Sequence, residues 1–260
     1  MEAAPVLAGL LTGIVVGVTG IGGGALMTPI LVFLLGVAPA TAIGTDLIFA
    51  TCTKLVAVGF HGSRGTIDWP IVRRLAYGSL PAAAVTMLFV HRLAGQGRAA
   101  DVIMPALGVA LTLTALAMIA KRPLQALGRR WRTTAAPTFK QLQPGLTVVA
   151  GVLIGTIVTL TSIGAGALGT VLLVYLYPFR LTPARLVATD LAHAVPVALV
   201  AGLGHLAVGN LDAPLLGALL VGSLPGVWIG SHLSVRAPEP ALRTAIAAIL
   251  LIVAVKILGS

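Results

Sequence analysis

The chain has 260 residues, of which 58% are hydrophobic and 9% are charged, and its formal net charge is +10. A soluble domain carries about 25% charged residues, so this composition excludes a soluble globular protein and predicts a polytopic membrane protein. Because Lys and Arg collect in the short cytoplasmic loops of such proteins, the positive charge does not indicate a nucleic-acid partner. A single cysteine, Cys52, excludes a disulfide framework and a cysteine-based metal site.

Apolar runs follow one another along both halves of the chain and predict an all-α membrane fold. They cover residues 5–19, 25–36, 39–60, 70–91, 101–120, 144–162, 166–178, 183–204, 213–235 and 240–258. The last three runs of each half reach the length of about 20 residues that a membrane crossing needs. The first two runs of each half are shorter and meet at a glycine cluster, so each pair is either a re-entrant hairpin or two tilted spans. Since Met1 to Pro5 lack a basic region, we expect mature structure here rather than a cleaved signal.

One long polar segment, residues 121–143, separates the two halves. It holds six basic residues and no acidic one: Lys121, Arg122, Arg129, Arg130, Arg132 and Lys140. We therefore predict a first membrane repeat over residues 1–120, a basic cytoplasmic linker over 121–143 and a second membrane repeat over 144–260.

The two halves are an internal duplication. The motif Thr45-Asp46-Leu47 matches Thr189-Asp190-Leu191, and Gly78-Ser79-Leu80-Pro81 matches Gly222-Ser223-Leu224-Pro225 with the same offset. Each half crosses the membrane an odd number of times under either interpretation of its first pair, so the second half enters from the opposite side. A cytoplasmic linker also places most arginines inside, which predicts inverted topology with both termini outside.

The glycine clusters are the predicted substrate site. Adjacent glycines disfavour a continuous helix, and matched helix breaks in two halves indicate a transporter binding site near the midplane. The helix that resumes after a break presents its N-terminus, which attracts anions. Close helix packing is the alternative; it explains Gly9, Gly13 and Gly17 but not three adjacent glycines. The predicted substrate-binding residues are Thr19, Gly20, Ile21, Gly22, Gly23, Gly24, Thr161, Ser162, Ile163, Gly164, Ala165 and Gly166.

Ionisable residues inside the apolar runs are candidates for coupling or for the substrate pathway. Asp46 and Asp190 either carry a proton or hold a broken helix end, because a carboxyl group at this depth is functional by default. Thr45 and Thr189 precede them, and His193 follows Asp190 on the same run. Lys54 pairs with the substrate or an aspartate, or extends to the interface; on a straight helix it lies too far from Asp46 for a direct pair.

Two further matched pairs lie at the ends of the runs. Asp68 and Asp212 begin the run that follows a turn, each with a proline within two residues, which predicts ordinary helix N-caps. His61 and His205 end the preceding runs and are expected to anchor loops, although a histidine can also titrate near neutral pH.

These motifs resemble those of the sulfite exporter TauE/SafE family, also called the toluene-sulfonate uptake permeases. The resemblance covers nearly the whole chain. It rests on Gly20-Ile21-Gly22-Gly23-Gly24 with Pro29, on Phe60 to Trp69 followed by Gly78, and on Ile163-Gly164-Ala165-Gly166, Gly204-His205 and Gly209 to Asp212. It implies a bacterial inner-membrane permease for sulfite, sulfonates, sulfoacetate or related organic anions. Ala165 departs from an all-glycine motif, and Asp46 and Asp190 stand where the family often has a small polar residue.

We therefore expect an alternating-access permease without a cofactor, with a small anion as substrate, membrane lipid as surroundings and protons as a candidate coupling ion. A second copy of the chain is a further candidate partner. The alternatives are an intramembrane enzyme, for which no nucleophile–base set or metal-spaced cluster appears, and a non-transporting assembly subunit, which would not need two matched helix breaks.

Overall fold

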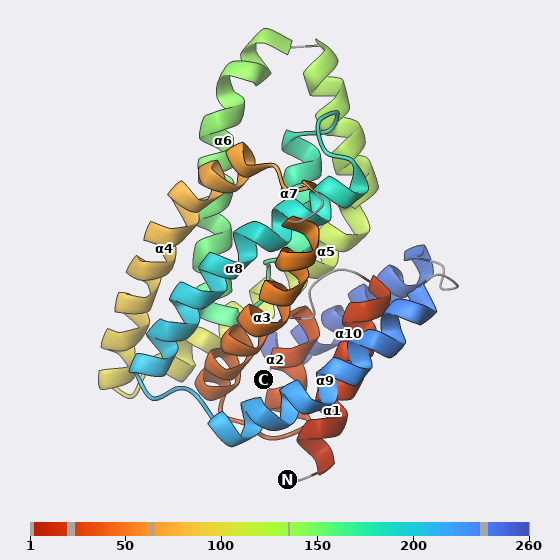
Figure 1. Ribbon diagram of the computed structural model, residues 1–260. Coiled ribbons are helices and arrows are strands. Elements are labelled where there is room, and N and C mark those ends of the chain that lie inside the picture. The colour runs from red at the N-terminus through yellow and green to blue at the C-terminus, as the bar shows by residue number, and fades with distance from the viewer. Residues whose placement is uncertain (1–2, 20–23, 63–64, 135, 235–238, 260) are drawn as a thin grey trace.

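The computed structural model describes residues 3–19, 24–62, 65–134, 136–234 and 239–259, and these residues form helices joined by short turns (Figure 1). The helices are α1 (Ala3–Thr19), α2 (Gly24–Phe33), α3 (Pro39–Gly62), α4 (Trp69–Gly95), α5 (Ala99–Thr134), α6 (Ala136–Thr161), α7 (Ala167–Leu176), α8 (Pro183–Ala207), α9 (Ala213–Ser234) and α10 (Glu239–Leu258). The expected all-α fold is confirmed, and each helix corresponds to one predicted apolar run.

The second helix of each half is short. α2 and α7 have 10 residues each, and at about 1.5 Å per residue such a helix is about 15 Å long. The hydrocarbon core is about 30 Å thick, so neither helix can cross it. Two full spans in each half therefore do not fit these lengths, and the re-entrant hairpin stays a prediction.

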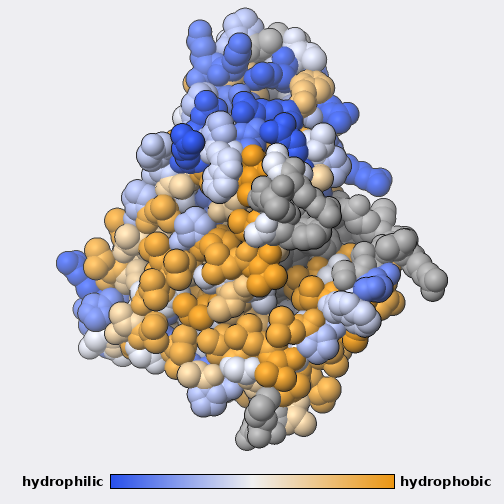
Figure 2. Space-filling view, in the orientation of Figure 1, coloured by the Kyte–Doolittle hydropathy of each residue, from blue (hydrophilic) through white to orange (hydrophobic). Residues whose placement is uncertain are grey.

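Five helices in the described part of the chain are long and apolar enough to cross a membrane. They cover Pro39–Gly59, Ala99–Thr133, Pro137–Thr161, Pro183–Ala207 and Ala213–Gly230. α4 and α10, with 27 and 20 residues, are long enough for a crossing but do not belong to these five. α6 does belong to them, although its apolar run was expected to be one of the shorter ones. Figure 2 shows an apolar surface over the body of the molecule on the face in view.

The segment predicted as a polar linker is largely helical. α5 continues through Lys121 to Thr134, and α6 begins at Ala136. The joined ends of the two helices project from the body, and hydrophilic side chains gather at this end of the molecule (Figures 1 and 2). The basic residues of this segment therefore lie on α5 and α6 rather than in a loop. The division into repeats at residues 120 and 144 stays a prediction.

Helices of one half pack on helices of the other, and the contacts correspond. α1 packs on α9, and α6 packs on α4. A Cβ added to Gly9 would overlap the backbone of Leu219, and one added to Gly151 would overlap the backbone of Leu75. These four positions are counterparts in the aligned halves. Close packing through small residues is thus confirmed for Gly9 at the interface of α1 with α9. The equivalent interface of α6 with α4 is packed in the same way at Gly151.

The core lies between α3 and α8, which are counterparts and pack on each other at the centre. Buried side chains such as Leu47 of α3 and Val197 of α8 belong to one cluster that also includes Leu173 of α7. A second cluster joins α5 to α10 through residues such as Leu111 and Leu250. The short helix α7 is consequently held from both sides, with its first turn directed into the interior.

Candidate functional site

The helix break of the second half is present in the structure. α6 ends at Thr161 and α7 begins at Ala167. Between them Ser162 has φ 59°, Gly164 has φ 115° and Gly166 has φ 135°. Glycine adopts these values readily and other residues rarely do. The glycines are therefore required by the backbone, and the predicted break is confirmed here.

The first turn of α7 is held by the break itself. Its N-cap, Gly166, has no side chain to cap the helix. The N–H of Gly169 donates to the carbonyl oxygen of Gly164 at 3.1 Å, and the N–H of Thr170 donates to that of Gly166 at 3.1 Å. A helix N-terminus of this kind carries a partial positive charge, which makes it a candidate anion site.

The two hydroxyl groups before the break have different roles. The N–H of Ile163 donates to the Thr161 hydroxyl at 3.1 Å, and that hydroxyl donates to the Ile157 carbonyl oxygen at 2.6 Å. Thr161 therefore holds the turn. The Ser162 hydroxyl is buried and has no hydrogen-bond partner, so of the two it is the group that a ligand can engage.

The corresponding break of the first half falls largely outside the described residues. α1 ends at Thr19 and α2 begins at Gly24, and Gly20, Ile21, Gly22 and Gly23 are not described. The predicted contribution of this cluster to a substrate site stays a prediction.

Asp46 holds the short helix of the first half. It is fully buried on α3, and its Oδ2 accepts a hydrogen bond of 2.6 Å from the Thr28 hydroxyl of α2. The Ser162 hydroxyl lies beside the same carboxyl group, although Oδ1 makes no contact with hydrogen-bond geometry. Asp46 thus joins α2 and α3 next to the break of the second half.

Asp190 lies against the short helix of the second half. It is 4% exposed on α8, and its Oδ1 occupies the space that a side chain at Gly169 would need. This oxygen has no hydrogen-bond partner. Gly169 therefore lets a carboxyl group approach the first turn of α7, where Asp190 and the N-terminus of the helix are close together.

Lys54 reaches from α3 to the break of the second half. Its Nζ donates to the Ala165 carbonyl oxygen at 3.3 Å, and the side chain is 6% exposed. Both Asp190 and Asp46 attract it electrostatically. The ion pairs within the described residues do not join Lys54 directly to either carboxyl group, and the spacing on α3 accounts for this at Asp46.

The remaining candidates hold helices together. The Thr45 hydroxyl accepts from the N–H of Asp212 at 3.1 Å, and the Thr189 hydroxyl accepts from the N–H of Asp68 at 3.0 Å. These two contacts are counterparts, and each joins one half to the other. His193 shares a hydrogen bond of 2.8 Å between its Nε2 and the Ser79 hydroxyl of α4.

The matched aspartates at the helix starts are N-caps, as predicted. Asp68 Oδ1 accepts from the N–H of Ile71, and Asp212 Oδ1 accepts from the N–H of Leu215. The buried His205 also anchors a neighbouring helix, with its Nε2 3.0 Å from the Thr159 carbonyl oxygen. The side chain of His61 lies outside the described residues.

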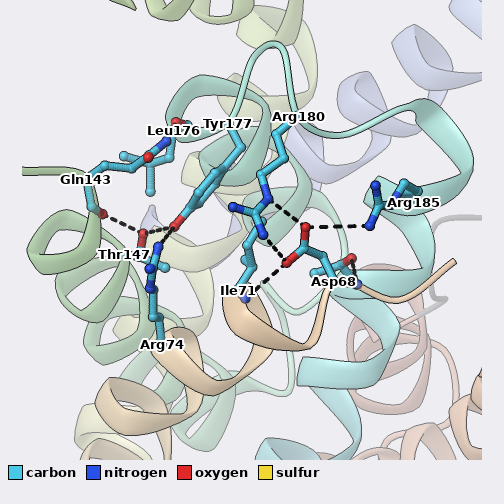
Figure 3. Close-up of polar contacts among 10 residues, drawn as sticks. Asp68, Ile71, Arg74, Gln143, Thr147, Leu176, Tyr177, Arg180 and Arg185 are labelled. Carbon is cyan, nitrogen blue, oxygen red and sulfur yellow. Dashed lines mark hydrogen bonds and ion pairs between the residues drawn. The ribbon is translucent and has the colours of Figure 1, made fainter. Parts of the chain in front are cut away.

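Sequence reasoning missed an ion pair at Asp68 (Figure 3). Arg180, in the turn after α7, donates to the two carboxylate oxygens of Asp68, from Nε at 2.7 Å and from Nη2 at 2.9 Å. Arg185 Nη2 lies 3.8 Å from Asp68 Oδ2. These hydrogen bonds raise the pKa of the Arg180 guanidinium above its usual value. Asp68 therefore joins the turn between α3 and α4 to the turn between α7 and α8.

A second contact group lies beside this ion pair. The buried Tyr177 hydroxyl is 2.8 Å from the Thr147 hydroxyl of α6, and Arg74 of α4 donates to it at 3.3 Å. Within the described residues there is no cluster of three or more His, Cys, Asp or Glu that could hold a metal ion. The sequence signal that could have found these contacts is the arginine pair near the start of α8, which has no counterpart in the first half.

The chain is similar to known membrane proteins over nearly its full length. The family model described as sulfite exporter TauE/SafE matches residues 6–257. The probable membrane transporter protein YjnA of Bacillus subtilis is 39% identical over 99% of this chain and 100% of its own length. The probable membrane transporter protein YdhB of the same organism is 26% identical over 93% and 94%. A probable membrane transporter protein of Haemophilus influenzae is 30% identical over 62% and 58%. No solved structure matches the chain.

Proposed function

The chain belongs to the sulfite exporter TauE/SafE family, and on that basis we propose that it carries small sulfur-containing or organic anions, of the sulfite, sulfonate and sulfoacetate class. It is a multi-pass membrane transporter of this family rather than an enzyme, since its relatives are named as transporters. The substrate class is the proposal, and the residues at the helix break support it.

The observation that carries this proposal is the surroundings of the α7 N-terminus. A buried ammonium group, Lys54 Nζ, lies at the carbonyl of Ala165, one residue before the N-cap. The unpartnered Ser162 hydroxyl lies in the same break. A helix N-terminus, a cation and a free hydroxyl together favour an oxyanion. The glycine cluster at residues 20–24 is proposed to supply the matching half.

Alternating access is the proposed mechanism. α1 and α6 pack on helices of the opposite half through glycines, and inverted-repeat transporters move one bundle against the other around a central site. The contact of α1 with α9 is equivalent to the contact of α6 with α4, and this symmetry between the halves supports such a movement. We propose that the breaks stay near the centre while access changes from one end to the other.

The coupled proton is proposed to bind at one of the two buried aspartates, Asp46 or Asp190. Each is buried, and each has an Oδ1 without a hydrogen-bond partner. Buried ionisable groups of membrane transporters commonly relay protons.

The protein is proposed to lie in the bacterial inner membrane, with the basic segment 121–143 in the cytoplasm and both termini outside, because Lys and Arg accumulate on the cytoplasmic side.

The direct test is anion flux. Purified protein in proteoliposomes is expected to exchange labelled sulfite, a sulfonate or sulfoacetate faster than empty vesicles, and a pH gradient is expected to drive accumulation. Simple carboxylates serve as a comparison for the sulfur-containing anions. If the reconstituted protein moves none of these anions under a substrate, pH or electrical gradient, the proposed function is wrong and a non-transporting assembly role takes its place.

A further inference from the structure

Three buried ionisable groups lie near the break of the second half, and the sum of their charges restricts the substrate. Asp46 and Lys54 lie on α3 with exposed fractions of 0% and 6%, and Asp190 lies on α8 with 4%. Both carboxyl groups attract Lys54, and Asp190 Oδ1 lies against Gly169 in the first turn of α7. Lys54 also holds the Ala165 carbonyl oxygen at the entrance of α7.

Building on the anion transport proposed above, we propose that the protein carries one monoanion together with one proton, and that Asp190 binds this proton when the anion replaces it as the counter-ion of Lys54. The single positive charge of Lys54 then selects a substrate with one negative charge, and the proton on Asp190 couples transport to the pH gradient. Asp46 remains uncharged in both states.

The empty site reaches neutrality with one ionised carboxyl group. A buried charge without a partner is strongly unfavourable, so two carboxylates cannot both stay ionised beside a single ammonium group. Asp46 accepts a hydrogen bond from the Thr28 hydroxyl at Oδ2 only, and its Oδ1 has no hydrogen-bond partner and can hold a proton. Asp190 is the ionised partner, because its Oδ1 lies against Gly169 in the first turn of α7, where the helix N-terminus favours a negative charge.

The loaded site reaches neutrality in only one way. An anion at the α7 N-terminus brings one negative charge within reach of Lys54, and a proton on Asp190 Oδ1 removes another. That oxygen has no hydrogen-bond partner and lies against the first turn of the helix, so it is available for a proton. A dianion would leave one uncompensated negative charge, because Asp46 is already protonated. The site therefore discriminates against dianions, and within the proposed substrate class it favours bisulfite and monosulfonates over sulfoacetate, which carries two negative charges near neutral pH.

Two other charged or titratable groups face these residues within the described part of the chain. His193 lies near Lys54 and is hydrogen-bonded to the Ser79 hydroxyl of α4, a contact that a neutral imidazole satisfies. Lys121 of α5 acts on Asp190 but is partly exposed, so water screens its charge. Neither group changes the balance among Asp46, Lys54 and Asp190.

The first experiment compares two probes on the wild-type protein in proteoliposomes. Methanesulfonate carries one fixed negative charge, and 1,2-ethanedisulfonate carries two. We expect a pH gradient to drive methanesulfonate uptake without current in solid-supported-membrane recordings, and ethanedisulfonate uptake to be at least tenfold slower. Uptake of ethanedisulfonate at a rate equal to or above that of methanesulfonate would overturn the proposal, as would a methanesulfonate current.

The second experiment compares the matched variants Asp190→Asn and Asp46→Asn. With Asn at 190 the empty site keeps the charge of Lys54, so methanesulfonate uptake should lose its dependence on the pH gradient and should carry current. Asp46→Asn should remain dependent on the gradient and free of current. Current-free, pH-driven uptake by Asp190→Asn would assign the proton to another group and overturn the proposal.

Lys54 variants complete the test. Lys54→Arg keeps the charge and should retain methanesulfonate uptake within about threefold, whereas Lys54→Gln should lose at least tenfold. Full uptake by Lys54→Gln contradicts the role of the lysine. The wild-type comparison of the two sulfonates still decides the matter if a variant fails to fold. If sulfite, methanesulfonate and sulfoacetate all fail to move with the wild-type protein, anion transport itself is wrong. Sulfite flux with equal methanesulfonate and ethanedisulfonate rates refutes only the charge rule.

Discussion

Asp68 and Asp212 cap equivalent helices but differ in their charged neighbours. Both carboxylates accept a backbone N–H three residues on, and within the described residues Arg180 pairs with Asp68 while no basic side chain pairs with Asp212. Asn caps a helix about as well as Asp, so Asp68→Asn removes mainly the charged hydrogen bonds. These are worth about 1.5–3 kcal/mol, and the partial exposure of Arg180 favours the lower end.

We therefore predict that Asp68→Asn lowers the thermal stability of the purified protein in detergent more than Asp212→Asn does. Arg180→Gln should cause a loss similar to that of Asp68→Asn. The double variant Asp68→Asn with Arg180→Gln should lose less than the sum of the two single losses, because the two residues share one interaction. Equal losses for Asp68→Asn and Asp212→Asn would show that the ion pair contributes nothing.

Sequence reasoning at this scale succeeded where the contact is local. A cap joins residues three apart, so the positions of Asp68 and Asp212 sufficed to predict it. Arg180 meets Asp68 across the fold, and no local spacing indicates such a contact. Thr45 and Thr189 were expected to line a pathway beside the aspartates, and the structure instead shows their hydroxyls accepting the backbone N–H of the opposite half. Their pathway role stays a prediction.

At the scale of helices, α9 offers a matched test of the glycine interface. A Cβ at Gly222 would overlap the backbone of Val6 in α1, whereas one at Gly217 would have no atom within 4 Å. Alanine is favoured over glycine in a helix by about 1 kcal/mol, and overpacking against a backbone costs about 1–3 kcal/mol. We predict that Gly217→Ala keeps or raises the thermal stability and that Gly222→Ala lowers it.

Both variants are measured by thermal unfolding in the same detergent, with anion exchange as a second readout. Because α1 and α9 belong to different halves, a shift of this interface should also slow anion exchange, so the Gly222→Ala protein should transport more slowly than the wild type. A Gly222→Ala protein as stable as Gly217→Ala would mean that the two helices separate without cost, which would contradict close packing as the reason for the glycine.

The bounds of the helices follow largely from hydropathy and from glycine. The apolar runs at residues 39–60 and 183–204 became α3 and α8 with small extensions, since a membrane helix must be apolar along its length. The break before α7 follows from Gly164 and Gly166, whose backbone conformations require glycine. The pairing of α1 with α9 does not follow, because many helices carry small residues and only the tertiary arrangement selects partners.

For the whole molecule, the two ends differ in charge. The projecting ends of α5 and α6 hold the basic residues of segment 121–143, and α1 begins at the opposite end of the molecule (Figure 1). Lys and Arg stay on the cytoplasmic side during insertion, so this end should face the cytoplasm. The turn between α4 and α5, at Gln96, should then face outside.

We predict opposite labelling of two single-cysteine variants in a Cys52→Ala background. Thr133→Cys and Gln96→Cys both replace exposed, uncharged residues, so neither changes the distribution of charge that determines orientation. In intact bacterial spheroplasts a membrane-impermeant maleimide should modify Gln96→Cys at once and Thr133→Cys only after the membrane is permeabilised. Inside-out vesicles provide the reciprocal control, in which Thr133→Cys reacts first. Reaction of both cysteines from one side would place α5 on a single side of the membrane and would refute the inverted arrangement of the two halves, because α5 must cross an odd number of times for the second half to enter from the other side.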